Sequence, residues 1–170
     1  MEFYDLMKAR YSVRKFKDEA VPEEMIHQLL EAVYLAPTAE NKQPLRVWTI
    51  KNKDRLEDIK KITKYHYNAP LSIAVGCVPQ EAWVRPCDGL NSGIIDASIA
   101  ATQLWLAASN IGLGAVWVSS FDVDKQKELF PEMNEAEIVV FMQIGFPEDN
   151  AKPAKWHSEK RAWDELFQDI

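Results

Sequence analysis

The chain has 170 residues, of which 47% are hydrophobic and 27% are charged, and this composition excludes a disordered or fibrous protein. Its 26 acidic and 20 basic residues give a net charge of -6, which disfavours binding to nucleic acid. The first ten residues lack a signal-peptide pattern, and no apolar stretch approaches the roughly 18 residues that span a bilayer. We therefore expect one domain over residues 1–170, located in the cytoplasm and not in a membrane.

Hydrophobic periodicity, prolines and glycines predict helices and strands in alternation. A short helix is expected over residues 2–9, and a second begins at Pro22 and ends before Pro37. Further helices are expected over 54–62, 91–110 and 125–129, and strands over 45–51, 71–78, 115–118 and 137–144. Five helices alternating with or flanking four strands indicate an α+β or α/β layered fold.

The predicted helix over residues 91–110 has almost no polar face. Asp96 is its only charged residue, so the helix is expected to be buried nearly all round. Gly112 is placed to end it as a left-handed cap. Such a helix lies either in the middle of a large core or against a second copy of the chain, and a two-fold dimer is the commonest such assembly.

A candidate anion site lies near the amino terminus. Arg10, Ser12 and Arg14 occupy alternate positions, so an extended backbone places them on one side. Arginine binds phosphate through two parallel hydrogen bonds, and serine adds a small donor. A solvated basic turn is the alternative interpretation. Lys160 and Arg161 form another small positive cluster close to the carboxyl terminus.

The sequence contains no familiar catalytic or metal-binding motif. The two cysteines and three histidines are too widely spaced for the usual zinc patterns, and we expect the thiols to be reduced. No G-x-S-x-G, Walker loop, H-E-x-x-H or G-x-G-x-x-G motif is present. Residues 36–44 combine small side chains with the amides of Asn41 and Gln43, which can hydrogen-bond to the edge of a flat ring. The alternative interpretation is an ordinary polar connection. Any chemistry is therefore expected to belong to a bound cofactor.

Four segments together resemble the FMN-dependent nitroreductase family. They are RYSVRKF at 10–16, LAPTAENKQPLRVWTI at 35–50, IDASIAATQLWLAASNIGLGAVWV at 95–118, and the terminal Arg161. The resemblance extends from Tyr4 to Arg161. It implies an α+β three-layer fold with a central, mostly antiparallel sheet, a long buried central helix and a homodimer.

The resemblance also implies a set of cofactor-binding residues. They are Arg10, Tyr11, Ser12, Arg14, Lys160 and Arg161 at the phosphate and ribityl end of FMN, Pro37, Thr38, Ala39 and Asn41 covering the flavin from the partner subunit, and Val118, Ser119 and Ser120 beside the flavin ring. The flavin sites would thus lie at the subunit interface. No catalytic side chain is implied.

The mechanism implied by the resemblance is ping-pong, with NADH or NADPH as the reductant. A nicotinamide delivers hydride to the flavin and leaves, and an electron-poor acceptor such as a nitroarene or a quinone takes its place. Relatives with this fold also dehalogenate, fragment flavin or oxidise heterocycles, and a non-catalytic flavin-binding protein is a further alternative. The loop over residues 83–89 is either a substrate contact or a surface connection.

Overall fold

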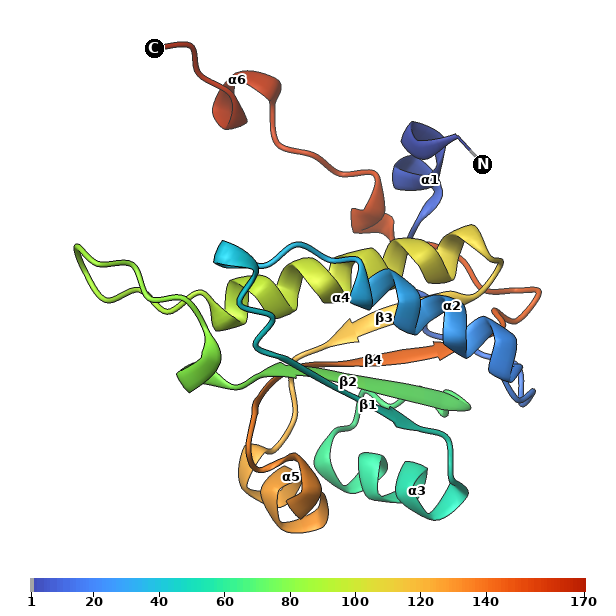
Figure 1. Cartoon of the computed structure of the whole chain (residues 1–170). Coiled ribbons are helices and arrows are strands. Elements are labelled where there is room, and N and C mark those ends of the chain that lie inside the picture. Colours follow the sequence, from blue (N-terminus) through green and yellow to red (C-terminus); the bar gives the residue numbers. More distant parts are fainter. Residues whose placement is uncertain (1) are drawn as a thin grey trace.

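The computed structural model describes residues 2–170 as a four-stranded sheet with helices on both faces (Figure 1). The strands are β1 (Leu45–Ile50), β2 (Leu71–Cys77), β3 (Gly114–Val118) and β4 (Glu137–Gly145), and the helices are α1 (Phe3–Ala9), α2 (Glu23–Tyr34), α3 (Lys53–Ile62), α4 (Gly93–Asn110), α5 (Val123–Leu129) and α6 (Trp163–Leu166). The strand order is β1-β2-β4-β3, and every neighbouring pair is antiparallel. The fold is therefore α+β, one of the two predicted classes.

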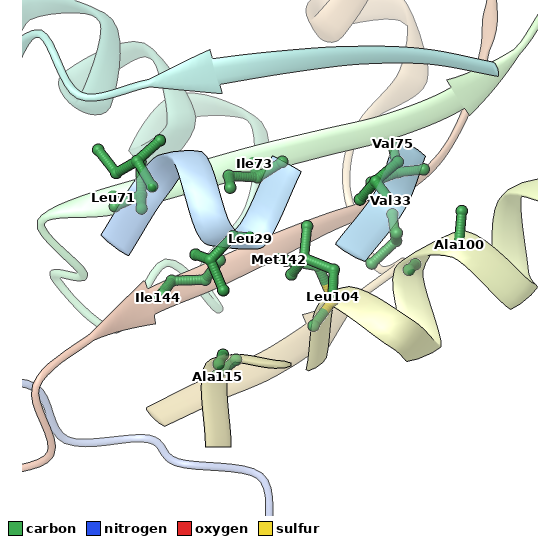
Figure 2. Packing of buried hydrophobic residues seen from close by; sticks show 14 of the residues in the cluster. Leu29, Val33, Leu71, Ile73, Val75, Ala100, Leu104, Ala115, Met142 and Ile144 are labelled. Carbon is green, nitrogen blue, oxygen red and sulfur yellow. The ribbon is translucent and has the colours of Figure 1, made fainter. Parts of the chain in front are cut away.

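The main core lies between the sheet and the pair of helices α2 and α4. Leu29 and Val33 of α2 point toward the strands, and Leu104 of α4 packs beside them (Figure 2). The sheet contributes apolar side chains from β2, β3 and β4, namely Leu71, Ile73, Val75, Ala115, Met142 and Ile144. A second cluster, which includes Ile59, Phe130 and Phe141, fills the space under α3 and α5 on the opposite face. Two apolar layers thus hold the sheet between the helices.

Within one chain, helix α4 is buried on one side only, so the first of the two expected arrangements, burial in the middle of a large core, is wrong for this chain, and burial against a second copy stays a prediction. Its small residues and Leu104 face the sheet, whereas Ile94, Ile95 and Ile99 are 49%, 48% and 37% exposed. The sheet and α2 together cover only one side of the helix, so its remaining apolar side chains are left at the surface. The predicted left-handed residue after the helix is confirmed, since Gly112 has a φ of 85°.

The segment that follows α1 joins the free edge of β3. Ser12 forms a parallel bridge with Ala115, and the backbone N–H of Val13 donates to the carbonyl of Ala115 at 3.1 Å. A Cβ atom on Gly114 would lie only 2.6–2.8 Å from the Val13 side chain. Glycine at position 114 therefore allows residues 10–14 to approach the sheet.

The chain after β4 returns along the same segment. The backbone N–H of Lys17 donates to the carbonyl of Phe146 at 2.8 Å, and Phe16 forms an antiparallel bridge with Pro147. The carboxyl-terminal arm, which is residues 148–170, then passes near α1 and ends away from the sheet (Figure 1). Among the helices of residues 2–170, none combines the length and the apolar character needed to cross a membrane.

Cys77 lies in the core at the end of β2, under the start of α4. Burial, followed by the nearby carboxylates of Glu137 and Asp96, raises the pKa of this thiol to about 11. Cys87 is exposed on the loop between β2 and α4, and both cysteines are free thiols. The buried cysteine is therefore a packing residue and not a nucleophile.

Gly114→Ala is expected to lower the free energy of unfolding by about 1–3 kcal/mol, because the added methyl group overlaps Val13. Adding Val13→Ala removes two of the three overlapping carbons, so the double variant should lose less stability than the sum of the single variants. Denaturant unfolding of the three variants measures this difference. Strictly additive losses would show that the two residues do not press on each other.

In a Cys87→Ser variant, Cys77 should not react with a thiol-specific disulfide reagent at pH 8, because it is buried and protonated at that pH. The same sample unfolded in guanidinium should release one equivalent of the chromophore per chain. Rapid stoichiometric reaction of the native variant would contradict the burial of this thiol.

Candidate functional site

A cavity of about 280 Å³, here called the Arg10 cavity, lies where the segment after α1 meets α4 and the carboxyl-terminal arm. Its lining residues are Arg10, Tyr11, Ser12, Arg14, Trp105, Ala154, Trp156, His157 and Lys160. Three of them are cationic, and none is acidic. The cavity is therefore suited to an anion, although the whole chain is acidic.

Arg10 is the half-buried cation of this cavity. Its guanidinium carbon lies 4.2 Å from the centre of the Trp105 ring, which favours the charged form through a cation–π contact. Partial burial lowers the pKa of Arg10 from its ordinary value. None of the ion pairs within residues 2–170 includes Arg10, so no carboxylate compensates its charge. A partly desolvated cation without a protein partner indicates a ligand of opposite charge.

The Trp105 ring also has an unused donor. Its Nε1 atom is buried and has no hydrogen-bond partner in the described chain. The ring lies 6.5 Å from the ring of Trp117 on β3. The cavity thus combines flat aromatic surface with polar groups whose hydrogen bonds are not satisfied by the protein.

The carboxyl-terminal arm closes the cavity through contacts with the amino-terminal segment. The Tyr11 hydroxyl donates to the carbonyl of Ala151 at 3.3 Å, and the His157 ring lies edge-on to Tyr11. His157 Nε2 also lies 3.3 Å from the carbonyl oxygen of Lys8. These contacts bring Lys160 to the cavity, whereas Arg161 is exposed and does not line it.

The residues predicted to cover the flavin lie elsewhere in the same chain. Residues 37–43, here called the Pro37–Gln43 loop, reach the first turn of α4, where the backbone N–H of Ala39 donates to Asp96 Oδ1 at 3.0 Å. Nine positions separate Asp96 from Trp105. At about 100° and 1.5 Å per residue, the two side chains leave α4 on opposite sides and about 13 Å apart along its axis. One chain alone therefore does not bring this loop to the Arg10 cavity.

The third predicted group lies where β3 ends. The Trp117 Nε1 atom donates to Ser119 Oγ at 2.7 Å, and that hydroxyl donates to the carbonyl of Val139 at 2.9 Å. The Ser120 carbonyl accepts a hydrogen bond from Thr63 at 2.7 Å. Within residues 2–170, the backbone N–H groups of Ser119 and Ser120 donate to no protein group, so they are free to bind a ligand.

The structure thus separates the predicted residues into three groups. Arg10, Tyr11, Ser12, Arg14 and Lys160 meet in one cavity, Val118, Ser119 and Ser120 follow along the same strand edge, and Pro37, Thr38, Ala39 and Asn41 lie across α4. Sequence reasoning missed Ala154, Trp156 and His157 because an aperiodic tail gives no signal of where it packs. Trp105 was expected in the buried helix, but not as a wall of this cavity.

The loop over residues 83–89 forms part of a hairpin that projects from the body beside the start of α4 (Figure 1). Val84 forms an antiparallel bridge with Asn91, and Arg85 pairs with Asp88. The two interpretations of this loop, a substrate contact and a surface connection, both stay predictions. No group of three or more metal-ligating side chains occurs in the part of the chain that the structure describes.

The model of the nitroreductase family matches residues 7–71 and 64–146. A protein from Methanothermobacter thermautotrophicus, provisionally named NADH dehydrogenase/NAD(P)H nitroreductase, is 30% identical over 173 residues, which cover 94% of this chain and 88% of that protein. The structure of a nitroreductase family protein from Clostridium difficile 630 is 31% identical, covers 99% of this chain and 98% of its own, and has a TM-score of 0.92.

A provisionally named nitroreductase from Desulfovibrio desulfuricans, solved in complex with FMN, is also similar. It is 25% identical, with a TM-score of 0.82 and coverage of 100% of this chain and 97% of its own. The family match covers well over half of the chain, and the likeness in structure extends over nearly all of it. The chain therefore belongs to the nitroreductase family.

Proposed function

We propose that this chain is a single-domain FMN oxidoreductase that transfers reducing equivalents from NADH or NADPH to an electron-poor acceptor, such as a nitroaromatic compound or a quinone. The observation that carries the proposal is the half-buried Arg10, which has no carboxylate partner within residues 2–170 and lies over Trp105 in a cationic cavity. Support comes from the similar D. desulfuricans protein, which was solved with FMN, and from the M. thermautotrophicus relative, whose provisional name includes NAD(P)H nitroreductase.

The residues of the cavity fit the phosphate end of FMN. Arg10, Arg14 and Lys160 supply positive charge, and Ser12 supplies a hydroxyl donor. The close approach of residues 10–14 to β3, which Gly114 permits, holds these groups at the sheet edge. Arg161 follows Lys160 on the same arm, and we expect it to reach the same phosphate from the solvent side.

The end of β3 fits the flavin ring. Val118 is buried, and it fixes the position of the two residues that follow it, Ser119 and Ser120, whose N–H groups donate to no group within residues 2–170. Fixed N–H donors stabilise negative charge that develops on a bound ring. FMN supplies the redox chemistry when bound, accepting hydride from a nicotinamide and passing electrons to the acceptor. No side chain of this protein is needed as an acid or a base in the hydride transfer.

A homodimer completes the site in this proposal. Ile94, Ile95 and Ile99 form an exposed apolar stripe on α4, and such a stripe is typical of an interface. A two-fold axis that passes beside this stripe, perpendicular to α4, would reverse the direction of α4 in the second copy. The Pro37–Gln43 loop of the partner would then lie near the Arg10 cavity, which the loop of the same chain does not reach.

The first experiment is to identify the flavin released from purified protein and to mix the loaded protein with NADH or NADPH without oxygen. We expect about one FMN per chain, and bleaching of its visible absorbance by at least one of the two reductants. Protein that binds flavin but is not bleached would be a binding protein or would have a different flavin chemistry. Protein that cannot be reconstituted with FMN would contradict the proposal altogether.

Arg10→Ala and Arg161→Ala are each expected to weaken FMN binding by about 1.5–3 kcal/mol, the usual loss for a hydrogen bond to a charged group. This loss corresponds to a dissociation constant raised roughly 10- to 100-fold, which flavin fluorescence titration measures. Lys127→Ala is the matched control, because it removes one positive charge from an exposed position on α5. Unchanged affinity in both arginine variants would place the phosphate elsewhere.

Ile95→Asp combined with Ile99→Asp should convert the dimer into monomers and abolish tight FMN binding, because charged groups cannot be buried in an apolar interface. Val123→Asp is the control, since Val123 is 49% exposed on the other face of the sheet. Sedimentation velocity reports the assembly, and titration reports the flavin. A monomeric wild-type protein that binds FMN tightly would exclude a shared site.

A further inference from the structure

Asp96 is a buried carboxylate on an otherwise uncharged helix. It is 2% exposed, and within residues 2–170 it forms no ion pair. Its Oδ1 atom accepts from the N–H of Ala39 at 3.0 Å, and its Oδ2 atom accepts from the hydroxyl of Ser92 at 2.8 Å. Its position in the first turn of α4 also places it near the positive end of the helix dipole. A buried carboxylate is unfavourable unless hydrogen bonds or opposite charges compensate for its lost hydration, and here the two hydrogen bonds do so.

The Pro37–Gln43 loop has a backbone conformation that must be held in place by a contact such as the one with Asp96. Glu40, Asn41 and Gln43 have φ angles of 50°, 55° and 52°, a left-handed conformation that residues other than glycine adopt only when their surroundings impose it. The loop contains no glycine. Its backbone is restrained from within by the N–H of Gln43, which donates to Thr38 Oγ1 at 3.0 Å.

The contact with Asp96 is the connection between this loop and the rest of the protein. Among the hydrogen bonds and ion pairs of the described chain, the bond from Ala39 to Asp96 is the only one that joins residues 37–43 to another element. Asp96 lies next to Ile95 on α4, and Ile95 is part of the exposed stripe. One helical turn therefore carries both the loop anchor and the proposed dimer surface.

We propose that Asp96 is a positioning residue that holds the Pro37–Gln43 loop in the left-handed conformation with which it covers the flavin of the partner subunit. This inference rests on the proposed function, because it assigns the loop to a flavin site shared between two chains. Asp96 acts through the N–H of Ala39 and does not itself contact the flavin. Losing its carboxylate should leave the fold of the sheet intact but release the loop.

The first test uses protein from which the flavin has been removed, so that it does not depend on the cofactor. Hydrogen exchange measured by mass spectrometry should show peptides that cover residues 38–43 exchanging about tenfold faster or more in Asp96→Ala than in the wild type. Peptides from β2 and β4 should be unchanged. Ser98→Ala is the matched control, because in the described chain that hydroxyl bonds only to the carbonyl of Ile94 on its own helix. Unchanged exchange in the loop would overturn the proposal.

Asp96→Asn keeps the test valid if the alanine variant does not fold. The amide oxygen can still accept from Ala39, but it is a weaker acceptor than a carboxylate, so loop exchange should rise by a smaller factor. FMN affinity should fall in the same order, from the wild type through Asp96→Asn to Asp96→Ala. Equal loop exchange in Asp96→Asn and the wild type, in the absence of a folded alanine variant, would also overturn the proposal.

The second test asks in which subunit the loop acts. Arg10→Ala and Asp96→Ala chains, carrying different affinity tags, are co-expressed, and mixed dimers are isolated by both tags. Each variant dimer should bind FMN about 10- to 100-fold more weakly than the wild type. The mixed dimer should regain one site of wild-type affinity, because one of its two sites receives an intact Arg10 from one chain and an intact loop from the other.

A mixed dimer without any tight site would mean that the loop does not serve the partner's flavin, and the inference would be wrong. A wild-type protein that binds no FMN would instead remove the proposed function. The exchange experiment would still report whether Asp96 holds the loop. The two failures are therefore distinguishable.

Discussion

The packing of α4 against the antiparallel sheet is the constraint on which the rest of the structure depends. Its sheet-facing positions are small residues and Leu104, which allow the helix to lie close to β2 and β4. With that side fixed, Asp96 faces the Pro37–Gln43 loop and Trp105 lies under Arg10. The same geometry leaves the isoleucine stripe at the surface. The positions of the Arg10 cavity, of Asp96 beside the loop and of the proposed interface thus follow from the orientation of one helix.

The electrostatics of the chain are local. A net charge of -6 disfavours a general affinity for phosphate backbones, yet the cavity around Arg10 is lined by cations, and no carboxylate within residues 2–170 lines it. Most lysines and arginines elsewhere form exposed pairs, such as Lys17 with Asp149, and these contribute little to stability. The unpaired and partly buried Arg10 differs from them, and this difference supports a binding role.

Much of the fold could be predicted from the sequence, because β2 and β4 are short apolar runs and α2 has apolar residues at helical spacing. Which side of α4 packs against the sheet could not be predicted, because a helix that is apolar on every side gives no signal of the side that meets the sheet. Arg10, Ser12 and Arg14 stood out by spacing. Trp156 and His157 could not be predicted as site residues, because their positions depend on how an aperiodic tail packs against the amino-terminal segment. Asp96 was visible as a lone charge, but its partner Ala39 is 57 residues away.

In the proposed function, two chains build each flavin site from opposite ends of their α4 helices. A crystal structure of the FMN-loaded protein tests it most directly. We predict that the flavin phosphate lies on Arg10, Ser12 and Arg14 of one chain, and that the Pro37–Gln43 loop covering the same flavin comes from the other chain. A flavin enclosed by a single chain, or bound away from Arg10, would contradict this shared site.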